Sequence, residues 1–160
     1  MRRAILIPLA ALALAGAAQA QNDDKARHFL RDALQGDNSE VMLGKMAAER
    51  GESPGLKHYG QMLVDDHSMH REKVLKVASG LGLPDDRQPM DVAAKERDKL
   101  SRMHGRDFDK EFAKYMVKDH RKDIKEYEKA EKMRGDVARL ARETLPTLHK
   151  HLDEAERLAG

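Results

Sequence analysis

The chain has 160 residues, with 30 lysines and arginines against 28 aspartates and glutamates, no cysteine, and only 4% aromatic residues. Without cysteine the chain has no disulfide, no thiolate metal site, no iron–sulfur cluster and no thiol redox chemistry. The balanced charge gives no electrostatic reason to expect nucleic-acid binding, and the high charged fraction with few aromatics favours helices over sheets.

The N-terminus has the order of a secretory signal peptide over residues 1–20. Arg2 and Arg3 form a positive region, Ala4 to Gly16 an apolar run, and Ala18-Gln19-Ala20 an A-x-A cleavage site. The apolar run is shorter than the about 20 residues that a transmembrane helix needs. We therefore expect export to the periplasm. Removal of this segment takes away two arginines and no acid, which leaves 28 charges of each sign.

The remainder, residues 21–160, fits one all-α domain, because helical periodicity dominates and strand signals are nearly absent. The pattern predicts four main helices and one additional short helix, which together form a four-helix bundle. In chain order they are Lys25–Arg50 with an interruption at QGDNSE, a helix from Pro54 to the GLGLPDDRQP stretch, Asp91–Met103, a helix from Phe108 to near Gly135, and Val137–Leu158.

Local chemistry predicts three features of these helices. Gly36 and Asn38 predict the interruption of the first helix, and Asn38 or Ser39 can cap the helical segment after the interruption. Ser53 at the N-cap and Pro54 at the first helical position predict the start of the next helix. Pro146 lies inside the last helix, where it should kink the helix or open its hydrogen bonds locally.

A short sequence is repeated. Val64-Asp-Asp-His67 returns 53 residues later as Val117-Lys-Asp-His120, and the flanking apolar positions agree in phase. Two related hairpins would bring the copies face to face near a pseudo-twofold axis. Aspartate and histidine that are adjacent on a helix do not face each other, so each acid would have to support the histidine of the other copy. In that arrangement Asp66 bonds His120, and Asp119 bonds His67.

Several histidines fall on the core-facing stripes of three different helices, and bundle cores are where facing helices build metal sites. The predicted ligands are Glu40, His67, His120 and His151, with His70 as a further candidate. Asp66 and Asp119 would stand behind them and fix the imidazole tautomers. In the alternative interpretation, the histidines are hydrogen-bonded core residues and the two acids are partly solvated partners of lysine or arginine. The methionines, which would suit Cu(I), are also ordinary core fillers.

Catalytic signatures are missing from the sequence. It contains no G-x-S-x-G, no P-loop and no H-E-x-x-H. It also lacks the Glu-x-x-His motif of ferritin-like di-iron proteins, which argues against ferroxidase chemistry by that route. No catalytic residue is assigned, and enzyme activity stays open.

The segments SEVMLGKMAAER, MLVDDH, FDKEFAKYMVKDH and TLPTLHKHLDEA resemble the DUF4142 family over roughly residues 25–158. The resemblance implies a ferritin-like bundle, export to the bacterial envelope, and a biochemical role that is not assigned. The family pattern matches at Glu40, Asp66, His67, Asp119, His120 and His151. The chain departs from it at His70, where a small residue is more usual.

These observations predict a periplasmic bundle that binds zinc, copper, iron or manganese in envelope stress or metal handling. The alternative is a metal-free, stress-associated interaction module that binds an envelope protein partner. A histidine-based pH sensor and a metal-dependent oxidoreductase also stay open.

Overall fold

The computed structural model describes the backbone of residues 9–160 and the side chains of residues 20–160. It contains five helices and, within that range, no strand: α1 Leu9–Arg50, α2 Pro54–Gly80, α3 Asp91–Leu100, α4 Gly105–Ala130 and α5 Gly135–Ala159. The all-α prediction is therefore confirmed. The predicted signal peptide begins outside the described residues and stays a prediction. No described helix is long and apolar enough to cross a membrane.

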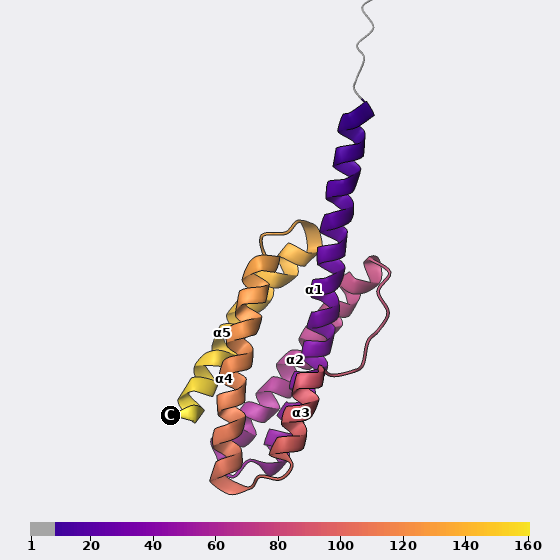
Figure 1. Cartoon of the computed structure of the whole chain (residues 1–160). Helices are drawn as coiled ribbons and strands as arrows, with labels where there is room; N and C mark the ends of the chain where they lie inside the picture. Colours follow the sequence, from indigo (N-terminus) through magenta and orange to yellow (C-terminus); the bar gives the residue numbers. More distant parts are fainter. Residues whose placement is uncertain (1–8) are drawn as a thin grey trace, which may run out of the picture.

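The four long helices form two antiparallel hairpins (Figure 1). Helix α1 packs along α2 and helix α4 along α5, while α2 meets α5 and α1 meets α4 across the bundle. The short helix α3 lies beside α1 and α4 at one end, and the N-terminal part of α1 projects beyond the other end (Figure 1). Around the bundle the order is therefore α1, α2, α5, α4.

Helix α1 is continuous through QGDNSE, so the predicted interruption is wrong. The polar side chains of this segment instead hold the loop between α2 and α3. Gln35 donates to the Asp86 carboxylate, Asn38 donates to the carbonyls of Asp86 and Gln88, and the N–H of Met90 donates to Ser39 Oγ. These contacts, together with packing of the flanking apolar residues, offset the weak helix propensity of Gly36 and Asn38.

Helix α1 begins at Leu9 rather than at the predicted Lys25, whereas the starts of the later helices agree closely with the sequence pattern. Ser53 caps α2 by accepting a hydrogen bond from the N–H of Leu56, and Pro54 stands at the first helical position, as predicted. Helix α3 ends at Leu100 rather than at Met103. Pro146 lies inside α5, where its missing N–H leaves the carbonyl one turn earlier without its helical donor.

The interior has two apolar clusters with a polar layer between them. One contains Phe29, Leu34 and Tyr127, and the other contains Leu63, Phe112 and Met116. The polar layer holds the buried polar side chains Asp37, Ser39, Glu40, His67, His70, His120, Thr144 and His151. Any chemistry in the core of this bundle has to come from that layer.

Candidate metal centre

Three histidines from three helices meet in the polar layer. On α2, His67 follows Leu63 by one turn; on α4, His120 follows Met116; on α5, His151 precedes Ala155. Each imidazole thus occupies a core position that an apolar side chain would otherwise fill. Exposure is 6% for His67 and 0% for both His120 and His151, so all three imidazoles are removed from solvent.

The three rings are close enough to share one ion. Their ring centroids are 5.3–6.0 Å apart, and one nitrogen from each ring lies within 4.8 Å of the other two. The shortest separation, 3.3 Å, joins Nε2 of His120 and Nδ1 of His151. Metal–nitrogen bonds of about 2.0–2.1 Å place two tetrahedral ligands roughly 3.3 Å apart, so this pair already has the spacing of two ligands.

The hydrogen bonds of His120 and His151 fix which nitrogens carry protons. Nδ1 of His120 lies 3.1 Å from the carbonyl oxygen of Met116, which can only accept, so Nδ1 is the donor. Nε2 of His151 lies 2.9 Å from a carboxylate oxygen of Asp66 and donates to it. When both rings are neutral, His120 Nε2 and His151 Nδ1 therefore face each other as bare lone pairs.

Both rings are neutral at pH 7. Burial lowers the pKa of His120 well below its ordinary value, and the neighbouring His67 and His151 lower it further. Burial, followed by the influence of His67, also lowers the pKa of His151 to about 4, although Asp66 acts in the opposite direction. A proton shared between the two rings is thus disfavoured, and the facing lone pairs lack a donor.

The third ring contributes a third lone pair. Nδ1 of His67 lies 2.9 Å from Oδ1 of Asp37 and donates to it, while Nε2 of His67 is buried and has no hydrogen-bond partner in the described part of the chain. An unpaired buried nitrogen costs about 1–3 kcal/mol. Each of the three imidazoles thus has an oxygen acceptor at one nitrogen and no proton donor at the other.

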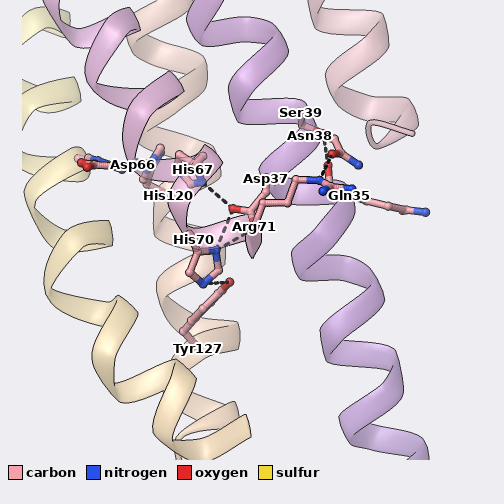
Figure 2. Close-up of polar contacts among 11 residues, drawn as sticks. Gln35, Asp37, Asn38, Ser39, Asp66, His67, His70, Arg71, His120 and Tyr127 are labelled. Atoms are coloured by element: carbon pink, nitrogen blue, oxygen red, sulfur yellow. Dashed lines mark hydrogen bonds and ion pairs between the residues drawn. The ribbon is translucent and has the colours of Figure 1, made fainter. Parts of the chain in front are cut away.

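Asp37 organises a second part of the polar layer (Figure 2). Its carboxylate is 2% exposed and accepts from Nδ1 of His67 and also from Nδ1 of His70, which lies 2.9 Å from both carboxylate oxygens. Nε2 of His70 lies 3.4 Å from the hydroxyl of Tyr127. Burial alone would raise the pKa of Asp37, but the two imidazoles, His70 first, lower it below its ordinary value, so Asp37 is ionised.

The predicted crossed pairs between the two sequence copies are wrong. Asp66 bonds His151 of α5 and not His120, whose two ring nitrogens contact Met116 and His151. Asp119 likewise does not support His67, because Nδ1 of His67 is bonded to Asp37. The supporting carboxylates are therefore Asp66 and Asp37.

Glu40 lies in the same layer but outside the three-histidine group. It is 1% exposed, and neither of its oxygens meets an N–H or O–H donor from the described residues. Its carboxyl lies beside that of Asp119. Burial, followed by the charge of Asp119, raises the pKa of Glu40 well above its ordinary value, so Glu40 is protonated.

A cavity of about 680 Å³ between α1 and α4 leads to this layer. Asp37, His67, Asp123 and Tyr127 are on its inner wall, and exposed lysines such as Lys122 are at its rim. Burial, with the charge of Asp119, raises the pKa of Asp123 to about 8. His67 on α2 therefore lies on the wall of a cavity that extends from one side of the bundle.

A family model described as "Domain of unknown function (DUF4142)" matches residues 11–158. Among solved structures, the crystal structure of a DUF305 fragment from Deinococcus radiodurans is similar, with a TM-score of 0.66 and 18% sequence identity. The match covers 88% of this chain and 95% of that fragment, and at this identity it establishes a shared helical fold. No curated protein matches the sequence.

Proposed function

The chain belongs to the DUF4142 family, and we propose that it is an exported protein of the cell envelope that binds a transition-metal ion through His67, His120 and His151. One observation carries the proposal: three buried imidazoles each have an oxygen acceptor at one nitrogen, and one nitrogen of each ring lies within 4.8 Å of a nitrogen of the other two. A cation is the group that satisfies three lone pairs at once.

The alternative, a set of hydrogen-bonded core histidines, does not account for the inner nitrogens. A hydrogen-bonded set needs a proton between each pair, yet burial keeps His120 and His151 neutral and their outer nitrogens already use the available protons. His67 Nε2 would stay unpaired in such a set. A bound ion removes both costs and gives each supporting oxygen the usual role of orienting a ligand.

Three neutral nitrogen donors suit zinc, copper, iron or manganese, with imidazole favouring the first three. Three protein ligands also leave a coordination position for water or another small ligand. Glu40, the predicted carboxylate ligand, would reach the ion only by leaving its contact with Asp119. We assign the protein to metal binding or buffering in the envelope under stress.

Metal binding is tested by thermal melting of the stripped chain with zinc, copper, iron and manganese added in turn. An ion at 100 times its Kd stabilises the folded state by about 2.7 kcal/mol, which corresponds to roughly 5–10 °C in Tm for a protein of this size. His151→Ala should abolish the rise. His149→Ala, which changes an exposed histidine on the same helix, should retain it.

A rise in Tm that survives in both His151→Ala and a His67→Ala/His120→Ala double variant would place the ion elsewhere and refute the assignment. No rise with any of the four metals would also refute it, and would favour the metal-free interaction module.

Export is tested separately. We expect the protein in the periplasmic fraction, with Gln21 as its first residue after cleavage behind Ala20. Recovery of the intact chain from the cytoplasm alone would refute this part of the proposal.

A further inference from the structure

We propose that Asp37, His67 and His70 form a second metal site beside the three-histidine site, and that His67 bridges the two ions through its two ring nitrogens. This inference rests on the proposed metal-binding function and makes the centre dinuclear. The bridging ring would be an imidazolate, with Nε2 directed to the first ion and Nδ1 to the second.

The geometry of the second group matches a ligand set. One atom each from Asp37, His67 and His70 lies within 4.8 Å of the other two. The two Nδ1 atoms are each 2.9 Å from Asp37 Oδ1. Bonds of about 2.0–2.1 Å place neighbouring ligands of an octahedral ion roughly 2.9 Å apart, so the present contacts already have that spacing.

A single metal site gives no role to His70. A histidine that binds a metal usually donates its other N–H to one carboxylate, and Asp37 accepts that hydrogen bond from His67. His70 adds a second buried imidazole to the same carboxylate from the next turn of α2, with both carboxylate oxygens in contact with its Nδ1. An ionised carboxylate enclosed by two imidazoles is the donor set of a divalent ion.

The cavity between α1 and α4 reaches the second site and gives it room for further ligands. Its wall includes Asp37 and His67, two of the three proposed ligands, so the cavity extends to the site. Asp123 and Tyr127 also line the cavity, which has room for water ligands. The first site has no comparable exposure, because His120 and His151 are fully buried.

The protons balance within the residues named. When an ion takes Nδ1 of His70, that ring changes tautomer, and Nε2–H donates to the Tyr127 hydroxyl, which now lies 3.4 Å away. His67 loses its Nδ1 proton to solvent and becomes the bridging imidazolate. Each second ion bound thus releases one proton.

The test is the number of Cu²⁺ ions bound by the purified chain, measured by metal analysis after dialysis, together with its electron paramagnetic resonance spectrum. We expect two ions in the wild type and one in both His70→Ala and His70→Gln, with two retained in the exposed-site control His149→Ala. Two Cu²⁺ ions joined by an imidazolate couple magnetically, so the wild-type spin signal should fall far below two spins. It should return to about one spin in the His70 variants.

The number of bound ions separates the proposed function from the second site. No ion in the wild type would refute the proposed function and this inference together. One ion in the wild type, lost in His151→Ala, would leave the proposed function standing and overturn the second site. Two ions in His70→Gln, or two uncoupled spins in the wild type, would show that the second ion lies elsewhere or that His67 does not bridge. Circular dichroism of each metal-free variant confirms that it is folded.

Discussion

The close crossing of α1 and α2 predicts that Gly60→Ala destabilises the protein. A Cβ atom added at Gly60 would lie 2.5 Å from the backbone nitrogen of Ala48, 2.6 Å from the carbonyl oxygen of Gly44 and 2.8 Å from Cβ of Ala47. The crossing stands two helical turns before His67 on α2 and two turns after Asp37 on α1. It therefore sets the distance between the two helices that carry that hydrogen-bonded pair.

Two effects of opposite sign determine the magnitude. Alanine stabilises a helix interior by about 0.5–1 kcal/mol relative to glycine. The added carbon, however, meets two backbone atoms, which cannot rotate away as a side chain can, so the helices must separate. Overpacking of this kind costs about 1–3 kcal/mol and occasionally more. We expect the upper end, and hence a net loss of about 2 kcal/mol or more in the free energy of unfolding.

Urea unfolding followed by circular dichroism measures this loss as a lower midpoint with an unchanged slope. The matched control is Gly80→Ala, the exposed last residue of the same helix, where an added Cβ meets nothing within 4 Å. The free energy of unfolding of Gly80→Ala should equal that of the wild type or exceed it by up to about 1 kcal/mol. If Gly60→Ala is as stable as Gly80→Ala, the close crossing does not determine the spacing of α1 and α2.

Three further predictions concern the polar layer. Burial keeps Glu40 protonated, so Glu40→Gln should change the free energy of unfolding in urea by less than about 1 kcal/mol. Glu40→Ala should lower it by about 2 kcal/mol or more. Equal losses in the two variants would contradict a neutral carboxyl. Tyr127→Phe removes the hydroxyl from Nε2 of His70 and should cost about 1 kcal/mol in the same assay, and no loss would mean that the contact is not a stabilising bond. In the metal-free protein, the unfolded chain protonates His151 near pH 6.5, whereas the folded chain, in which the pKa of His151 is lowered, does so only near pH 4. The contribution of His151 to stability, about 3 kcal/mol, should therefore be lost as the pH falls through this range. The lowered pKa of His120 acts in the same direction, so stability in His151→Gln should fall less than in the wild type, and an equal fall would refute this origin.

The sequence predicted most of the fold because the signals were local. The Ser53–Pro54 start of α2 is a capping pattern with few alternatives, and the structure has it. The core positions of the three histidines followed from steps of three and four residues between apolar side chains, which fix a helix face without any tertiary information. His67, His120 and His151 came together because those faces all point to the bundle axis.

Asp37 was not among the site residues predicted from the sequence, and the reason is also physical. Gly36, Asn38 and Ser39 favour turns when they are judged by propensity alone, and Asp37 lies among them. Their partners are in a loop about 50 residues further along the chain, which local rules do not see. The available signal was periodicity: Asp37 stands three residues before Glu40, on the same face as the apolar residues of α1.

The wrong partners of Asp66 and Asp119 result from the order of helices around the bundle. Helices α2 and α4 stand diagonally, with α5 and α1 between them. Adjacent residues on a helix diverge by about 100°, so when the histidine of each copy points to the axis, the aspartate before it points to a neighbouring helix. Asp66 of α2 accordingly bonds His151 of α5, and Asp119 of α4 contacts Glu40 of α1.

In both copies of the repeated sequence the aspartate lies against a polar side chain of a neighbouring helix, and the pseudo-twofold axis itself stays a prediction. In this respect Glu40 is the counterpart of His151, since each lies beside the aspartate of a Val-x-Asp-His copy. The difference lies in the proton. An imidazole that donates one proton to its aspartate keeps a lone pair for an ion, whereas a protonated carboxyl offers no such negative charge to an ion. The layer therefore offers three imidazoles to an ion, while the remaining long helix, α1, contributes a neutral carboxyl.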